Sequence, residues 1–411
     1  MDWLLLMINN VSPSGVLDIG SYQSKCIIFR ITNSRIEILS KVILKTEGIK
    51  KGFVTDLKKL SDLINKLIGK AEDIANLQIN TIYLSISPIN YSSVYFCNSK
   101  NIGSYQVEHE KDVQFLINDS VNLFKDSYSG SEIVHLLNLN FRTDKINYIE
   151  NPVCLVADSF ESDSHIIFSK KNILKNFTNI FSANNLKLEK FIYSPFALAL
   201  SIHEESPLSD ANIVIDFGHE HTSLSIFEND NFILAASIPL GSLHVTNDVA
   251  KSLNLNFDIA ESLKINHSSC EILSGKILHE YVESENFGTR SYKKVSNNIL
   301  NQVVRSRVDE IIDFINRELL YFRTYKKNFN KIILTGEGSK IKGLEQVLKA
   351  QLIVTALVIE KFTPKIKNGL GDEFDVCLSM INYIKNPYFA EIPSYKSSKQ
   401  GLFEKLYSLF N

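Results

Sequence analysis

The chain has few of the residues that mark disulfide-rich or metal-stabilised proteins. Its 411 residues include nine prolines, one tryptophan and five cysteines, with no CxxC pair and no cysteine/histidine cluster. The cysteines are Cys26, Cys97, Cys154, Cys270 and Cys377. An odd, scattered set favours reduced cytosolic thiols over a disulfide framework or a zinc site.

The sequence also lacks a charge bias and a long apolar run. A net charge of -2 implies no general attraction to nucleic acid, and no nucleic-acid partner is expected. No segment approaches the roughly 20 consecutive apolar residues of a transmembrane helix. The apolar start, residues 1–8, has no basic region or cleavage site, so it predicts an extension rather than a signal peptide, with the start open between Met1 and Met7.

The chain does contain enough apolar residues to form large hydrophobic cores, and these residues recur at the spacings typical of strands and helices. Hydrophobic residues form 44% of the chain, which allows two or more domains. Short apolar runs over 16–46 predict a β-meander, and helical spacing over 56–77 and 303–321 predicts amphipathic helices. Lys331–Leu334 predicts a strand that leads into the turn Gly336–Ser339. Strands interleaved with helices in two similar halves predict an α/β fold.

Two short segments about half a chain apart have the same design. Val16–Ser21 and Ile213–Gly218 are apolar strands that end in Asp-x-Gly and a polar turn. Each returns as a second apolar run, Cys26–Ile31 or Leu224–Phe227. One such triplet is usual in hairpins, but the repeated pair resembles the hairpins with which actin-like ATPases hold a nucleotide between two lobes.

The first of these turns has the residue types that a phosphate requires. Gly20 lets backbone N–H groups approach, Ser21 adds a hydroxyl, and Lys25 adds a positive charge if it faces the turn. Asp18 would hold water on a bound Mg²⁺. The turn is not a Walker A loop, because GxxxxGK[ST] is absent, and not a Rossmann turn, because a strand follows it. The glycine turn at 336–339 has the usual shape for approach to a ribose or phosphate, although an ordinary strand-to-helix connection is equally open for it alone.

In more detail, the chain resembles FtsA, the family of bacterial actin-like cell-division proteins. The most specific match is Ile238-Pro239-Leu240-Gly241 followed by His244–Ala250. Further matches are Glu47–Asp56, Asn151–Ile167, Glu261–Lys264 and Leu334–Gly343. The resemblance covers roughly residues 14–385 and the tail, and implies an actin-like ATPase fold of class α/β, with two lobes, a duplicated core and an inserted subdomain.

The resemblance implies a division of the chain into six parts. These are a first-lobe core at 1–83 plus 167–205, an inserted subdomain at 84–166, a second-lobe core at 206–250 plus 326–385, an outer subdomain at 251–325, a linker at 386–400 and an amphipathic membrane-targeting helix at 401–411.

It also implies ATP and Mg²⁺ in the cleft between the lobes. The residues assigned to the nucleotide are Asp18, Gly20, Ser21, Lys25, Asp216, Gly218, Thr222, Glu261, Lys264, Gly336, Gly338 and Ser339. Asp18 and Asp216 are assigned to Mg²⁺ through water. No residue is assigned to position an attacking water, so we expect at most slow ATP hydrolysis and mainly a structural adaptor.

The second turn departs from the family pattern, which is rich in glycine and threonine. Here it is Gly218-His219-Glu220-His221-Thr222, and Glu337 replaces a usual glycine in the third turn. A carboxylate at 220 repels a triphosphate unless Mg²⁺ intervenes, which argues against efficient hydrolysis. Because the two histidines have no carboxylate or cysteine partner at matching spacing, they are predicted to be solvent-facing turn residues rather than metal ligands.

The last eleven residues form an apolar helical face. Its members are Leu402, Phe403, Leu406, Tyr407, Leu409 and Phe410. Spacing alone leaves a membrane-interface helix and a helix docked on the body or a partner equally open. The resemblance favours the membrane, and Lys396, Lys399 and Lys405 add about 1 kcal/mol each of attraction to anionic lipid near the surface. One short helix binds weakly, so polymerisation would supply avidity.

The resemblance thus implies a function in cell division. Such a protein polymerises head to tail, binds FtsZ through its outer subdomain and tethers FtsZ filaments to the cytoplasmic side of the inner membrane at the division site. It also helps to recruit other division proteins. Two alternatives are an FtsA-like pilus-assembly scaffold, which has no comparable tail, and an actin-fold kinase, which requires a catalytic aspartate and a substrate pocket.

Overall fold

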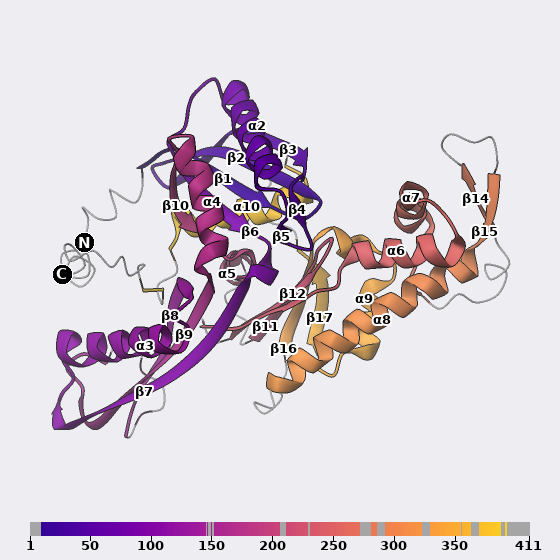
Figure 1. Ribbon diagram of the computed structural model, residues 1–411. Coiled ribbons are helices and arrows are strands. Elements are labelled where there is room, and N and C mark those ends of the chain that lie inside the picture. The colour runs from indigo at the N-terminus through magenta and orange to yellow at the C-terminus, as the bar shows by residue number, and fades with distance from the viewer. Residues whose placement is uncertain are drawn as a thin grey trace. The chain divides into compact units, whose positions relative to one another are not determined.

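The described residues of the computed structural model form two compact units (Figure 1). The structure describes residues 10–144, 146, 149, 152–205, 211–228, 231–271, 281–285, 292–322, 329–354, 356–362, 370–387 and 391–392. Unit 1 comprises Met1–Ser201, Asn231–Ile233 and Val376–Asn411, and unit 2 comprises Ile202–Asp230 and Leu234–Asp375.

Unit 1 contains a five-stranded sheet of order β10-β6-β1-β2-β3. Its strands are β1 (Asn10–Ile19), β2 (Gln23–Thr32), β3 (Arg35–Lys45), β6 (Thr81–Ile86) and β10 (Lys187–Phe191). The first three are antiparallel neighbours, while β6 runs parallel to β1 and to β10. This arrangement confirms the β-meander predicted over 16–46.

The sheet of unit 2 repeats this plan, with order β13-β12-β11-β16-β17. Its strands are β11 (Ala211–Phe217), β12 (Thr222–Glu228), β13 (Asn231–Ile238), β16 (Phe329–Thr335) and β17 (Ala356–Lys361). Strand β11 is antiparallel to β12 and parallel to β16, and β16 is parallel to β17. The two sheets therefore share one topology, as expected of a duplicated core.

Helices form where apolar residues recur at helical spacing. Helix α2 (Leu57–Ala75) packs on β2 and β3, and its N-cap Asp56 accepts a hydrogen bond from the Lys59 N–H at 3.0 Å. Among the described residues, the other helices of eight or more residues are α3 (Gln114–Ser127), α4 (Lys171–Ala183), α5 (Ser194–Glu205), α6 (Ser242–Leu253), α7 (Phe257–His267), α8 (Asn297–Phe322), α9 (Leu344–Gln351) and α10 (Asp375–Lys385). Helices α2 and α8 confirm the two amphipathic helices predicted from spacing.

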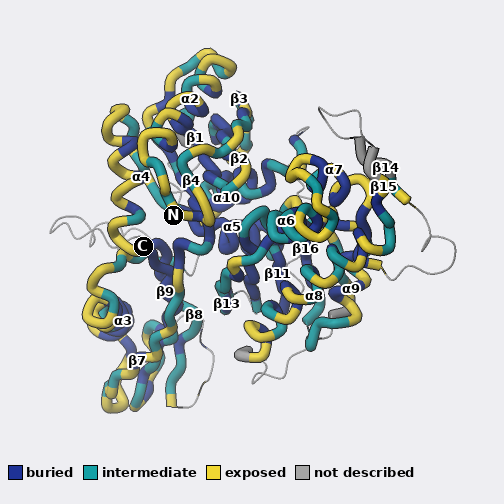
Figure 2. Tube along the Cα trace, turned by 45° about the vertical axis from the view of Figure 1, so that its right-hand side comes forward, coloured by how far each residue is buried: buried dark blue, intermediate teal, exposed yellow. Residues whose placement is uncertain are grey.

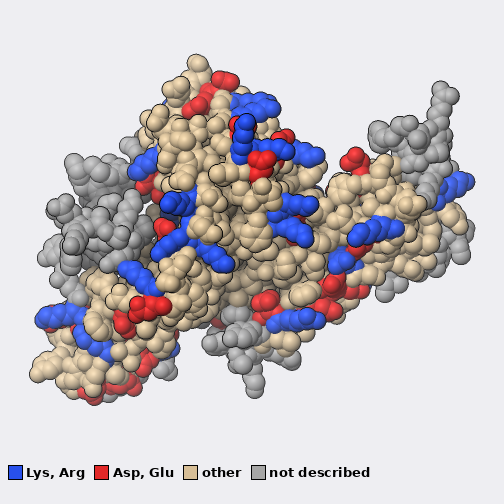
Figure 3. Space-filling view, viewed as in Figure 1, with Lys and Arg blue, Asp and Glu red and all other residues tan. Residues whose placement is uncertain are grey.

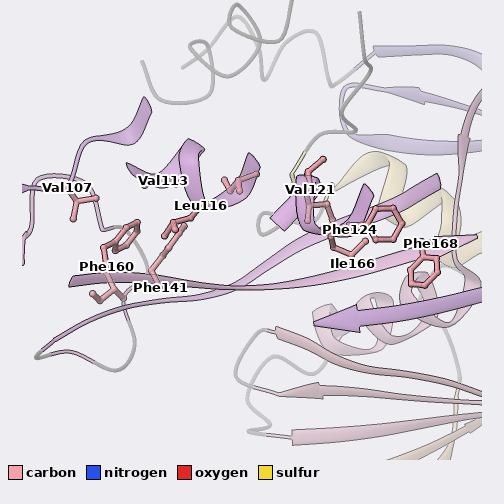
Figure 4. Packing of buried hydrophobic residues seen from close by; sticks show 12 residues of the cluster. Val107, Val113, Leu116, Val121, Phe124, Phe141, Phe160, Ile166 and Phe168 are labelled. Carbon is pink, nitrogen blue, oxygen red and sulfur yellow. The ribbon is translucent and has the colours of Figure 1, made fainter. Parts of the chain in front are cut away.

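A separate three-stranded sheet in unit 1 has its own core. Its order is β7 (Tyr91–Gln106), β9 (Val156–Lys170) and β8 (Ser131–Thr143). Helix α3 covers it, and Figure 4 shows Leu116 of α3 near Phe160 and, farther along α3, Phe124 beside Phe168. The short hairpin β4 (Ile49–Lys50) and β5 (Phe53–Val54) precedes α2.

Unit 2 contains a hairpin that periodicity did not predict. Strands β14 (Tyr281–Glu285) and β15 (Tyr292–Ser296) pair within the region 251–325, where the sequence predicted a helix over 303–321 but no strand. Each strand has five residues, and Glu283 lies opposite Lys294, so the apolar alternation that signals a strand is weak here.

Burial and charge follow the layers of each unit. In Figure 2 the sheet strands are largely buried, and the outward faces of helices such as α2 and α8 are exposed. On the face shown in Figure 3, basic and acidic side chains are intermixed. Among the described residues, no helix is long and apolar enough to cross a membrane.

Candidate functional site

The first Asp-x-Gly turn joins β1 to β2 and brings four predicted residues together. Ile19 pairs with Ser24, so residues 20–23 form the turn. A side chain at Gly20 would place Cβ 2.8 Å from the Gln23 carbonyl oxygen, so the turn requires glycine. Asp18 lies opposite Lys25, whose Nζ is 3.2 Å from Asp18 Oδ2. Lys25 therefore faces the turn, as the phosphate hypothesis required.

Ser21 has the clearest unmet hydrogen-bonding capacity in this turn. Its Oγ is buried and has no hydrogen-bond partner among the residues that the structure describes. Because buried hydroxyl groups in proteins are normally hydrogen-bonded, the Ser21 hydroxyl favours a bound ligand that accepts or donates a hydrogen bond here. Together with the Lys25 cation and the Asp18 carboxylate, this donor set fits a phosphate with an associated Mg²⁺.

The second turn joins β11 to β12 with the same geometry. Phe217 pairs with Thr222, and the turn again has four residues, 218–221. Cβ at Gly218 would lie 2.8 Å from the His221 carbonyl oxygen, matching Gly20. Asp216 lies opposite Ser223, which thus occupies the position of Lys25. The two aspartates are equivalent, but the lysine belongs to the first turn.

Thr222, predicted to contact the nucleotide, makes a hydrogen bond within unit 2. Thr222 is fully buried, and its hydroxyl donates to the Leu240 carbonyl oxygen at 2.8 Å. The neighbouring Ser223 Oγ is buried without a hydrogen-bond partner in the described part of the chain. Ser223 was not identified as a site residue from the sequence. Its position in the strand that follows the turn was the only feature of the sequence that could have indicated it.

Of the two histidines of the second turn, His221 is buried, contrary to the prediction, whereas His219 is partly exposed. His221 is 8% exposed, and burial lowers its pKa to about 4. The start of α6 covers the turn, because Ser242 N–H donates to the Gly218 carbonyl oxygen at 3.0 Å and Leu243 N–H to that of His219 at 2.7 Å. Burial also lowers the pKa of His219, which lies in the electrostatic environment of Glu261 and Lys264.

The third turn lies beside the second. Strand β16 pairs with β11 so that Thr335 is opposite Asp216, and Gly336 follows with φ +82°. A Cβ at Gly336 would clash with Asp216 Oδ1, and one at Gly338 with the Phe217 ring. Unit 2 thus brings Asp216, Gly336 and Gly338 together.

Two side chains of the third turn make local contacts. Ser339 Oγ donates to the Gly336 carbonyl oxygen at 2.7 Å, so this hydroxyl stabilises the turn. Glu337 forms a 3.0 Å ion pair with Lys340, and both side chains are more than half exposed. That pairing weakens the repulsion that Glu337 was expected to exert on a nucleotide.

Glu261 and Lys264 form the predicted pair, but deep between α6 and α7. Lys264 is 6% exposed, and its ammonium donates to Glu261 Oε2 at 2.8 Å, Thr246 Oγ1 at 2.9 Å and the Ser242 carbonyl oxygen at 3.3 Å. Burial lowers its pKa, which the Glu261 carboxylate opposes. Three acceptors fill the ammonium's three donor positions, so the pair braces two helices. Thr246, within the Ile238–Ala250 stretch, was not singled out from sequence.

The predicted residues therefore fall into two groups. Asp18, Gly20, Ser21 and Lys25 belong to unit 1, and the other eight nucleotide residues belong to unit 2. The proposed membrane residues Leu402, Phe403, Leu406, Tyr407, Leu409 and Phe410 lie outside the described residues.

Comparison with known proteins finds similarity to cell-division proteins. A family model described as cell division protein FtsA matches residues 213–391. Cell division protein FtsA of Agrobacterium fabrum is 26% identical over 353 residues, which covers 81% of this chain and 78% of that protein.

Solved structures extend the similarity to the fold. The PilM-PilN type IV pilus biogenesis complex contains a chain that is 16% identical with a TM-score of 0.66, covering 92% of this chain and 99% of that one. MreB5 of Spiroplasma citri bound to ADP is 11% identical with a TM-score of 0.53, covering 91% and 98%. These likenesses confirm the actin-like ATPase fold.

Proposed function

Because an FtsA family model matches residues 213–391 and FtsA of Agrobacterium fabrum is 26% identical, we propose that the chain is an FtsA-type cell-division protein that binds ATP and tethers FtsZ filaments to the inner face of the cytoplasmic membrane. In this proposal it also polymerises head to tail and works with other division proteins at the division site. Membrane attachment is assigned to residues 401–411, whose apolar face is a property of the sequence.

The observation that carries the nucleotide part is the pair of equivalent Asp-x-Gly turns. The first combines Asp18, Lys25 and the partnerless Ser21 hydroxyl, and the second lies against the Gly336–Gly338 turn. The crystal structure of MreB5 of Spiroplasma citri, which has a similar fold, contains bound ADP, and this supports the proposal that the present chain binds a nucleotide.

Asp18 and Asp216 are the residues that would hold Mg²⁺, through water molecules. Each lies near the end of a central strand, one residue before the last of β1 or β11. Bound Mg²⁺ would neutralise phosphate charge. His219 and Glu220 in the second turn, in place of small residues, support slow rather than rapid hydrolysis.

The family match favours cell division over the two alternatives. The likeness to the pilus biogenesis complex is 16% identical and shows the fold alone. A kinase would transfer phosphate rapidly to a sugar, so turnover with a sugar acceptor would support that alternative.

Co-sedimentation with vesicles tests the proposal. Full-length protein, FtsZ polymers and vesicles containing anionic phosphatidylglycerol are combined with and without Mg²⁺-ATP. We expect the full chain to bring FtsZ into the vesicle pellet, and a chain truncated before Gly401 to leave both in the supernatant. Undiminished vesicle binding by the truncated chain would refute the tail assignment, and bound protein without FtsZ would refute tethering.

A further inference from the structure

A buried carboxylate lies just beyond the last helix of unit 1. Glu391 follows the end of α10 by six residues, and its side chain is 6% exposed. Three elements donate to it: His135 Nδ1 of β8 at 2.7 Å, Lys190 Nζ of β10 at 2.6 Å and the Tyr383 hydroxyl of α10 at 2.5 Å. We call these four residues the Glu391 clamp.

The backbone at the clamp is held as well. Glu391 forms an antiparallel bridge with Leu137 of β8, and the Ile392 N–H donates to the Leu136 carbonyl oxygen at 2.8 Å. Ile392 also packs against the apolar core shared by α3 and the three-stranded sheet. Residues 391 and 392, expected in a linker, thus extend the edge of β8.

The hydrogen bonds define the charge state of the clamp. His135 Nε2 accepts the Tyr193 N–H at 3.0 Å, so the imidazole proton lies on Nδ1 and is donated to Glu391. Burial lowers the pKa of His135, consistent with this neutral form. Burial alone would raise the pKa of Glu391, but the hydrogen bonds that it accepts and the Lys190 charge outweigh burial and lower this pKa. Lys190 and Glu391 are therefore the charged pair.

We propose that the Glu391 clamp is the attachment point of the C-terminal segment, so that the segment leaves unit 1 from β8 rather than from the end of α10. The consequence of this attachment for membrane binding rests on the proposed function of residues 401–411. From Ile392 to Gly401 the chain can span at most about 30 Å, whereas from Lys385 it can span about 55 Å. The clamp thus roughly halves the reach of the tether and ties it to the three-stranded sheet.

Hydrogen exchange of the Ile392 amide tests the clamp in the full-length protein. Lys190→Met should raise its exchange rate by more than about tenfold, because one member of a buried charge pair is left uncompensated. Tyr383→Phe, which keeps the ring, should raise it by a smaller factor. Lys187→Met is the matched control, since it removes a 64% exposed lysine from the same strand. Equal Ile392 exchange in all three variants and the natural protein would overturn the proposal.

Fluorescence energy transfer from the protein to membrane lipids tests whether the clamp shortens the tether. A dye on the exposed Cys154, in a Cys97→Ser background, reports its distance from acceptor lipids in phosphatidylglycerol vesicles. We expect lower transfer for bound Lys190→Met than for bound Lys187→Met, because the released tether is longer. Equal transfer would overturn the tethering role. If the natural protein leaves the vesicles unbound, the proposed membrane function fails, while amide exchange still decides the clamp.

Discussion

At the scale of residues, the two Asp-x-Gly turns are equivalent in backbone but unequal in charge. Lys25 lies 3.2 Å from Asp18, and Ser223 occupies the matching position opposite Asp216. The sequence suggested an asymmetry from His219 and Glu220. The structure adds that the cation belongs to the first turn, where the Ser21 hydroxyl is buried without a partner in the described chain.

Lys25→Met should therefore weaken ATP binding by about tenfold or more, since a charge-assisted hydrogen bond contributes roughly 1.5–3 kcal/mol. Displacement of a fluorescent nucleotide measures the dissociation constant. Lys66→Met, on the exposed face of α2, is the control and should leave affinity unchanged. If Lys25→Met also binds normally, the phosphates lie elsewhere.

Gly338 illustrates why some site residues are poor probes of ligand binding. A Cβ at this position would clash with the Phe217 ring. Any larger residue must first displace the end of β11, which carries Asp216. Loss of nucleotide affinity in a Gly338 variant would therefore report disrupted packing as much as a lost phosphate contact.

At the scale of elements, the contact with the Thr246 hydroxyl is the shorter of the two contacts by which Lys264 braces α7 against α6. Thr246 Oγ1 is 2.9 Å from the Lys264 ammonium and also contacts the Glu261 carboxylate. Helix α6 of this pair covers the second turn through the N–H groups of Ser242 and Leu243. The brace thus links the most specific family motif to the predicted nucleotide residues.

Thr246→Val, nearly identical in shape, should destabilise α6 and α7 by about 1–3 kcal/mol, because a buried ammonium loses an acceptor. Native-state hydrogen exchange on these helices measures the loss. Thr178→Val on α4 is the control, since its hydroxyl donates to the Leu174 carbonyl oxygen of its own helix, at 3.0 Å. Similar losses in both variants would contradict the brace.

At the scale of the whole molecule, buried histidines in both units couple stability to pH. Burial lowers the pKa of His165 in unit 1 and of His221 in unit 2 from 6.5 to about 4. The unfolded chain binds these protons first as pH falls below 6.5. Their contribution to stability is therefore complete above 6.5 and decreases as pH falls toward 4.

Between pH 7 and pH 5 each of these histidines should reduce the free energy of unfolding by roughly 2 kcal/mol. Urea midpoints at the two pH values measure the change. His221→Gln should remove part of the pH dependence, and His267→Gln, at an exposed position, should leave it intact. A midpoint that rises on acidification would contradict the assigned burial.

What the sequence by itself determined is local in origin. Period-2 and helical apolar patterns predicted β1 to β3, α2 and α8, and the duplicated Asp-x-Gly turns predicted two related halves. The residue strings that resemble FtsA indicated the family and fold. These features were accessible because neighbouring residues encode strand, helix and turn.

What only the tertiary structure decided are the partners of polar side chains. Lys264 is enclosed by Thr246 and Glu261, His221 is buried beneath the start of α6, and Glu391 is bound by His135, 256 residues away. A sequence pattern defines which face of an element is apolar, but not which distant groups meet there. The energy of a buried charge depends on those groups, so its role could be assigned only after the chain was folded.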